Sequence, residues 1–283
     1  MFPTPIDKTS APTRLLYKVV LPISLAVWLL PIIAVMLTSF RGQGDLAAGN
    51  YWGIPSQWML IENYSAVFQN TPMVQFVLNS FYVTIPTVIG TVVLSTLAGF
   101  ALGTYRFKLN MVVFLLFVGG NFVPYQILMV PVRELALKMG MYDTTQGLVL
   151  FHIAFQTGFA TFFLRNFIRD LPYELVEAAR IEGANEWQIF YRVVLPLVRP
   201  AVAAVAVLIF TFIWNDYFWA TVLIQGNHAM PVTGGLKSLN GQWVAQWQLV
   251  SAGSILAALP PVVIFFLLQK QFIAGLTVGA TKG

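Results

Sequence analysis

Hydrophobic residues along this chain gather into long stretches without charge, and shorter segments between them carry the charged residues. The charge-free stretches run from Lys18 to Arg41, Glu62 to Arg106, Lys108 to Arg133, Asp143 to Arg165, Arg199 to Asp216 and Lys237 to Lys270. A charge at mid-bilayer costs about 2.5 to 3.5 kcal/mol, and a spanning helix needs about 20 apolar residues. We therefore expect six transmembrane helices, near residues 19–39, 76–102, 110–131, 145–164, 200–224 and 251–269. The fifth is expected to continue past Asp216, the one acid placed inside a span.

The composition supports a membrane protein and excludes several other classes. Hydrophobic residues make up 58% of the 283 residues and charged residues 10%, with a mean hydropathy of +0.74. Soluble domains are about half apolar and a quarter charged, so a soluble globule, a disordered chain and a nucleic-acid binder are all disfavoured. We expect an all-α polytopic membrane protein that forms a single transmembrane domain over residues 1–283. The chain has no cysteine, which excludes disulfides, thiolate metal sites and cysteine nucleophiles.

The positive charges predict the orientation of the chain, because cytoplasmic loops are enriched in Lys and Arg. With six spans, both termini lie on one side of the membrane. That side carries 12 basic residues and the other carries 4, Arg41, Arg133, Lys138 and Lys237. The first side therefore is expected to be cytoplasmic, with both termini, the 103–109 loop and the 165–199 loop. Residues 40–75 form an external loop, and a short outer helix is expected from Val132 to Met139.

The 165–199 loop is polar where the rest of the chain is apolar, and its pattern predicts two short helices. Asp170 is a candidate cap for the first helix, whose first turn tolerates Pro172. Glu174, Glu177 and Arg180 mark the exposed side. A narrow apolar stripe of Leu171, Leu175, Ala178 and Ile181 marks the other side. Gly183 supplies a C-terminal stop.

A second helix is expected from Glu186 to Leu195. Asn185 and Gln188 have the spacing of a capping box, and Pro196 is expected to end the helix. The predicted product is a helix-Gly-helix hairpin over residues 170–196. It could be a solvated connector, but a connector needs only a few residues, and capped helices with small and acidic residues suit docking into another protein.

Several residues of this hairpin resemble the EAA loop of ABC-importer permeases. They are Glu177-Ala178-Ala179, Gly183-Ala184, Phe190, Leu195-Pro196 and Pro200. Glu182 stands where the family more often has Asp, so the charge is kept. The resemblance implies the MetI-like permease fold, with the first loop helix as the coupling helix that contacts the ATPase subunit. The residues implied in that contact are Glu174, Glu177, Ala178, Ala179, Arg180, Gly183 and Ala184.

Other segments look like the carbohydrate-uptake branch of this family and its MalG-type subunit. They are Leu30-Pro31, Thr38-Ser39-Phe40, Asn79-Ser80, Trp214-Asn215-Asp216-Tyr217 and the tail from Phe272 to Gly283. The resemblance implies a sugar, polyol or glycoside importer of the bacterial inner membrane. It also implies its partners: a second, different permease, an ATPase homodimer that holds ATP and Mg, and an extracytoplasmic solute-binding protein. No cofactor is expected on this chain itself.

Candidate substrate-pathway residues are Asn215, Asp216, Tyr217, Asn121 and Gln126. An intramembrane acid indicates function by default, although Asp216 could instead pair with Asn or backbone inside the bundle. His152 is expected to pair with Gln156 one turn away. A permease for another small solute, an ion-coupled secondary transporter and a membrane enzyme are the alternatives. An ion-coupled transporter needs more mid-membrane ionisable groups than the Asp216 and His152 that this chain offers. A membrane enzyme needs a catalytic motif, which the sequence lacks, and Gly234–Ser238 lacks P-loop spacing.

Overall fold

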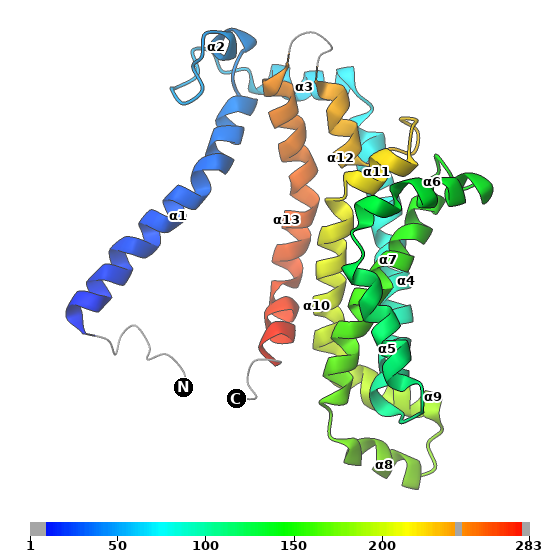
Figure 1. Ribbon diagram of the computed structural model, residues 1–283. Helices are drawn as coiled ribbons and strands as arrows, with labels where there is room; N and C mark the ends of the chain where they lie inside the picture. Colours follow the sequence, from blue (N-terminus) through cyan, green and yellow to red (C-terminus); the bar gives the residue numbers. More distant parts are fainter. Residues whose placement is uncertain (1–9, 241–244, 279–283) are drawn as a thin grey trace. The chain divides into compact units, whose positions relative to one another are not determined.

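The computed structural model describes residues 10–240 and 245–278, and within these ranges the regular structure is helical (Figure 1). Five helical stretches among the described residues are long and apolar enough to cross a membrane. A further pair of apolar helices, bent by 88° at a short break, makes a sixth crossing if the pair is counted as one span. The continuous stretches are α1 (Ala11–Ser39), α4 (Met73–Thr104), α7 (Thr145–Arg169), the helix over Glu186–Trp214, and Trp247–Gln269 within α13 (Trp247–Val278).

The chain divides into two compact units. One comprises residues 1–71 and 238–256, and the other comprises residues 72–237 and 257–283. In the first unit, α2 (Gln43–Ala47) and α3 (Leu60–Asn70) follow α1, so the expected external loop is ordered. Arg41 is fully buried there, and its Nη1 donates a hydrogen bond to the Asn50 carbonyl at 2.7 Å. Asn63 donates to the carbonyl oxygens of Ser39 and Arg41, so these contacts fix the loop's path.

The second unit is organised around the pairing of α4 with α7. Gly99 and Gly103 lie where the two helices come closest. A Cβ atom on Gly99 would lie 3.1 Å from the backbone nitrogen of Arg165, and one on Gly103 would lie 3.3 Å from the Arg165 carbonyl oxygen. Small residues let membrane helices approach closely, and these glycines bring the ends of α4 and α7 together.

The expected third span over residues 110–131, in which Gly119, Gly120 and Pro124 indicate a kink, is interrupted at these residues. It consists of α5 (Asn110–Gly119), two 3₁₀ turns (Gly120–Phe122 and Tyr125–Leu128) and α6 (Met129–Lys138), with the chain extended at Val123. Pro124 explains the break, because proline lacks an N–H group and forces the preceding residue toward extended geometry. The expected short outer helix from Val132 to Met139 corresponds to the end of α6.

The bounds of the fifth span were predicted incorrectly. The second hairpin helix does not end at Pro196: it runs from α9 (Glu186–Gln188) through a π-helical segment (Ile189–Val194) into α10 (Leu195–Trp214). A π-helical turn makes i→i+5 hydrogen bonds, and this turn just before Pro196 accommodates the missing N–H donor. The helix then ends at Trp214, and α11 (Phe218–Leu223) begins separately, so Asp216 lies between two helices instead of inside a span. The short α12 (Val232–Gly235) follows.

Candidate functional site

The predicted hairpin is present at one end of the second unit, where α8 (Tyr173–Ile181) lies beyond the end of α5 and α9 follows it (Figure 1). The structure places α6 at the opposite end of this unit. The N-cap of α8 is Pro172, with no side-chain hydrogen bond, and Asp170 is instead the C-cap residue of α7. The prediction that Asp170 caps the first helix is therefore wrong.

Gly183 ends α8 as predicted. Its φ is +84°, in the left-handed region that favours glycine. The Ala184 N–H donates to the Ala179 carbonyl and the Gly183 N–H donates to the Arg180 carbonyl, both at 3.0 Å. These two bonds form a Schellman motif. Beyond it, the predicted capping box is also present, because Asn185 and Gln188 each accept a backbone N–H from the other at 2.9 Å.

The two faces of α8 differ from the prediction. Val176, with 5% of its surface exposed, is the residue that packs into the unit, against a cluster that includes Ile168 and Ile189. Of the predicted apolar stripe, Leu171 is partly buried and packs against the same cluster. The rest of the stripe points outward: Ala178 is exposed, Leu175 is 43% exposed and Ile181 is 87% exposed. The outward surface of α8 therefore combines apolar side chains with acids, and we call it the α8 outer face. Its residues are Glu174, Leu175, Glu177, Ala178, Ile181 and Glu182.

Arg180 does not contribute its side chain to the α8 outer face. Its Nε donates to Oε1 of Glu186 at 3.0 Å, and its Nη1 donates to the Tyr173 hydroxyl at 3.1 Å. The Tyr105 hydroxyl, on the loop after α4, also donates to Glu186, and the Arg180 guanidinium lies 5.7 Å from the Tyr105 ring centre. Arg180 thus ties α8 to the next helix and to the 103–109 loop.

These contacts shift the ionisation of two groups. The hydrogen bond to Glu186, followed by that to Tyr173, raises the pKa of Arg180 above its usual value. Burial, followed by the hydrogen bond to Glu186, raises the pKa of Tyr105 to about 12. Both groups therefore keep their protonated forms at neutral pH. Tyr105 and Glu186 could not be predicted as partners of Arg180, because no fixed spacing along the sequence relates them to it.

Asp216, a predicted pathway residue, caps α11. Its Oδ2 accepts the Ala220 N–H at 3.0 Å and its Oδ1 accepts the Trp219 N–H at 3.3 Å. The same Oδ2 lies 3.5 Å from Nε2 of His152, which is 3% exposed. That separation is a close contact without hydrogen-bond geometry. Hence His152 faces Asp216, and its predicted pairing with Gln156 is not the contact that the structure shows.

The other pathway candidates lie at two helix breaks. Asn215 donates to the Thr211 carbonyl at 2.8 Å and Asn121 donates to the Phe117 carbonyl at 2.9 Å, so each amide side chain bonds to the last turn of the helix before its break. Gln126 and Tyr217 are exposed. The breaks themselves are adjacent, since the ring of Tyr125 lies 5.2 Å from that of Phe218.

No group of three or more His, Asp or Glu side chains is placed to hold a metal ion within the part of the chain that the structure describes. Residues 9–278 match the family described as "Binding-protein-dependent transport system inner membrane component". The chain belongs to this family of permeases. It is thus a multi-pass membrane component of a binding-protein-dependent transport system.

Two curated relatives and one solved structure extend the comparison. The chain is 32% identical to the osmoprotective compounds uptake permease protein GgtD of Synechocystis, over 93% of this chain and 92% of that protein. It is 33% identical to the arabinooligosaccharides transport system permease protein AraQ of Halalkalibacterium halodurans, over 89% and 91%. A crystal structure of a bacterial ABC transporter that imports alginate superposes with a TM-score of 0.79, at 22% identity, over 93% of this chain and 99% of that one. The chain therefore has the MetI-like permease fold that the resemblance implied.

Proposed function

We propose that this chain is one of two different permease subunits in an ATP-driven importer, and that α8 is its coupling helix. In this proposal ATP and Mg are bound by a separate ATPase homodimer, and an extracytoplasmic solute-binding protein delivers the substrate. The whole chain, residues 1–283, acts as one permease domain. Its own contribution is to stabilise an inward-facing and an outward-facing conformation to different degrees.

The observation that carries this proposal is the construction of the α8 outer face. Ile181, at the end of α8, is 87% exposed, and Leu175 on the same helix is 43% exposed. Exposed apolar side chains grouped with charges at their rim are typical of protein interaction sites. A Schellman motif, a capping box and the Arg180–Glu186 ion pair fix the orientation of this face. A connector without a partner would need none of these contacts.

The proposed orientation places α8 and both termini in the cytoplasm, on the strength of the 12 to 4 distribution of basic residues. Trp52, which is 72% exposed, then lies outside. Since the chain has no native cysteine, Trp52→Cys and Gly183→Cys can be made singly. An impermeant maleimide added to intact cells should label the first and spare the second. The reverse pattern would invert the orientation.

For the substrate we propose a sugar or a related polyol or glycoside, in the cytoplasmic membrane of a bacterium. The named substrates of the relatives support this class, since AraQ is named for arabinooligosaccharides. GgtD is named for osmoprotective compounds, so a permease for another small solute is the alternative. An ion-coupled transporter would need more ionisable groups at mid-membrane than His152 and Asp216 provide.

We also propose that the substrate pathway passes the two adjacent helix breaks, after Phe122 and after Trp214. Non-helical backbone at membrane depth is tolerated where it is buried in protein or lines a cavity. Tyr217 and Gln126 are exposed there and can offer an aromatic ring and an amide to a sugar. The Asp216 carboxylate already accepts two backbone N–H groups. In this proposal it stabilises the backbone beside the pathway, and the neighbouring side chains contact the substrate.

The coupling proposal is tested by Gly183→Trp in the importer purified with its partner chains. A large side chain at φ +84° strains the turn by about 1 kcal/mol and would clash with a docked ATPase. Gly140→Trp is the matched control, because Gly140 also has positive φ, at +67°, and open space around it, but follows α6 at the opposite end. We expect only Gly183→Trp to lose its ATPase subunits, or to hydrolyse ATP at a rate that does not rise when substrate-loaded binding protein is added.

Charge reversal provides a second pair of variants. Glu177→Lys changes an exposed acid of the α8 outer face, and Glu134→Lys makes the same change on α6. Only the first should weaken ATPase attachment. Normal substrate-stimulated hydrolysis in both Gly183→Trp and Glu177→Lys would mean that the hairpin is a connector.

A further inference from the structure

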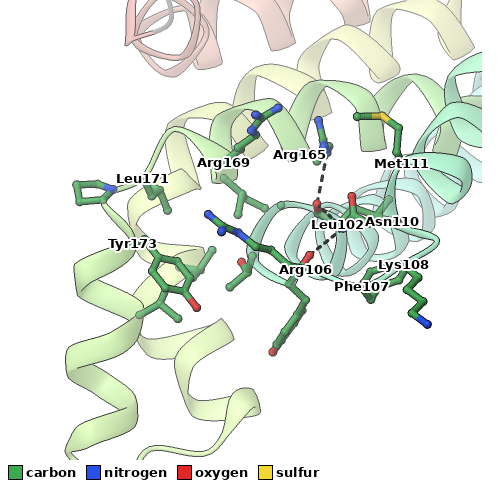
Figure 2. Close-up of a pocket in the computed structure, with 17 residues that line it drawn as sticks. Leu102, Arg106, Phe107, Lys108, Asn110, Met111, Arg165, Arg169, Leu171 and Tyr173 are labelled. Carbon is green, nitrogen blue, oxygen red and sulfur yellow. Dashed lines mark hydrogen bonds between the residues drawn. The ribbon is translucent and has the colours of Figure 1, made fainter.

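A cavity of about 670 Å³ lies beside the hairpin, where the ends of several helices meet. Its walls are the last residues of α4, the 105–108 loop, the first residues of α5, the end of α7 and the start of α8. Figure 2 shows Arg165 and Arg169 projecting from the same stretch of α7, with Arg106 on the loop opposite. Because every wall is a helix end or a connecting loop, the cavity lies at the level of the membrane–water boundary in the proposed placement.

The charge of this cavity is entirely positive. Arg106, Lys108, Arg165 and Arg169 line it, and no Asp or Glu is among its described lining residues. Arg165 and Arg169 are four positions apart, so they share one face of α7. Like charges at this spacing repel each other unless an anion lies between them. The described lining residues therefore bring four cationic side chains together with no acidic side chain among them.

Arg165 is the buried member of this group, with 6% of its surface exposed. Its guanidinium carbon lies 4.0 Å from the centre of the Phe114 ring, and its Nε donates to the Leu102 carbonyl at 3.4 Å. No acceptor among the described residues takes the terminal Nη groups. A guanidinium stacked on a ring keeps the N–H groups at its edge available, in the fork geometry that matches phosphate oxygens. Arg165 is thus a preformed donor at the edge of a basic cavity.

Exposed apolar side chains lie on one wall of the cavity. Phe107 and Met111 line it and are 45% and 54% exposed, and Leu109 between them in the sequence is 61% exposed. In a membrane such side chains contact acyl chains, while the adjacent basic groups meet the head groups. Basic pockets between helices on the cytoplasmic side are suited to anionic lipid head groups.

We propose that this cavity binds a phosphate group, and that the phosphate is the head group of an anionic phospholipid of the cytoplasmic leaflet. Arg106, Arg165 and Arg169 hold the phosphate oxygens, and Phe107, Leu109 and Met111 contact the acyl chains. Since Tyr173 and Val176 of α8 also line the cavity, the bound lipid supports the hairpin from behind its outer face. The inference rests on the proposed membrane placement, and free phosphate is the other source of the same chemistry.

The test compares three forms of the importer, each purified with its partner chains and placed in nanodiscs of phosphatidylcholine with added phosphatidylglycerol. The cavity variant is Arg106→Gln with Arg169→Gln, both exposed residues whose loss spares the buried Arg165. The control is Arg192→Gln with Arg199→Gln, which removes the same charge from exposed positions of the helix over Glu186–Trp214, outside the cavity. Native mass spectrometry measures the phosphatidylglycerol that each complex retains.

Each basic residue near an anionic surface contributes about a fivefold gain in binding, so losing two should lower phosphatidylglycerol affinity roughly thirtyfold. We expect this loss in the cavity variant and a markedly smaller one in the control, whose two residues can contribute only general attraction to the anionic surface. Radiolabelled inorganic phosphate, dialysed against the complexes in phosphatidylcholine alone, distinguishes the sources. If it binds the unmodified complex, is lost in the cavity variant and no phosphatidylglycerol is retained, the phosphate site stands and free anion is its ligand.

Equal phosphatidylglycerol retention in all three complexes, without any difference in phosphate binding, would overturn the proposal. So would a cavity variant that keeps its lipid but loses its ATPase subunits, since the basic groups would then contact protein. Phosphatidylglycerol is present in both leaflets of a nanodisc, so this result does not depend on orientation. An inverted orientation would be revealed by the maleimide labelling alone.

Discussion

Nε2 of His152 lies 3.5 Å from Oδ2 of Asp216, which connects the buried interior of α7 to the break between α10 and α11. Asp216 also accepts the Trp219 and Ala220 N–H groups. One carboxylate thus begins α11 and faces a buried imidazole from another helix. This arrangement gives Asp216 a structural function at the place where the substrate pathway is proposed.

We expect Asp216→Asn to perturb the importer less than Asp216→Leu. The amide keeps one acceptor for the cap of α11, whereas Leu keeps none, and loss of a cap costs about 0.5 to 2 kcal/mol. The measurement is the thermal unfolding midpoint of the purified complex together with substrate uptake. His152→Gln, alone and combined with Asp216→Asn, shows whether the two effects couple. Equal loss of uptake in Asn and Leu variants at normal assembly would instead indicate that the negative charge is required.

The Tyr105 hydroxyl makes the attachment of α8 sensitive to alkaline pH, at which the contact is lost. Its pKa is raised from 10.0 to about 12 by burial and by Glu186. A raised pKa favours the neutral form in the folded state, so the contribution is complete below about pH 10 and is lost as the pH rises through about 12.

A spin label on Ala178→Cys should report this loss as increased mobility between about pH 10 and 12. Tyr105→Phe removes the hydroxyl and keeps the ring that lies against Arg180. That variant should be more mobile at neutral pH and show no further step. An identical alkaline step in Tyr105→Phe would assign the change to another group.

Asp143 fastens the segment after α11 to the start of α7. Its Oδ1 accepts the N–H groups of Gln225 and Gly226 at 2.7 and 2.8 Å. Burial acts to raise the pKa of Asp143, but the Gly226 and Gln225 donors lower it overall. Since a lowered pKa stabilises the ionised form, the contribution is present at neutral pH and is lost as the pH falls below the ordinary value of 3.8.

Variants at Asp143 separate the hydrogen bonds from the backbone strain. The residue has a φ of +59°, which Asn tolerates and Ala does not. Asp143→Asn should therefore cost least, Asp143→Gly should lose only the acceptor, and Asp143→Ala should lose both, by about 1 to 2 kcal/mol. Proteolytic cleavage rates within residues 224–230 measure this order. If Gly and Ala variants were cleaved equally, the strained φ would contribute nothing.

The elements that could be predicted from the sequence are those determined by neighbouring residues. Charge-free stretches located the spans because each must cross an apolar layer. Gly183 and the Asn185–Gln188 capping box were predicted correctly because their bonds join residues a few positions apart.

The two helix breaks could not be located in this way. Pro22, Pro31 and Pro86 lie inside helices without breaking them, so proline alone does not mark a break. The contacts found at the breaks are the packing of the Tyr125 ring against Phe218, which are distant in sequence, and the Asp216 cap on α11.

The exposed side of α8 also depended on distant contacts. A short amphipathic helix could bury its Leu175 stripe or its Val176 side, and the pattern favoured the stripe. The structure buries Val176 because Ile168 and Ile189 meet there, and Arg180 is drawn to Glu186 instead of to Glu177. Neither choice follows from spacing within α8.

The most direct test of the coupling assignment is the accessibility of position 181. In the chain by itself Ile181 is 87% exposed. If α8 is the coupling helix, Ile181 becomes buried against the ATPase subunit in the assembled importer. Ile181→Cys should react with a maleimide rapidly in the permease pair without ATPase and at least about tenfold more slowly in the assembled importer. Leu137→Cys, on α6 and 54% exposed, should react equally in both. Equal reactivity of Ile181→Cys with and without bound ATPase would contradict the central claim that α8 is the coupling helix.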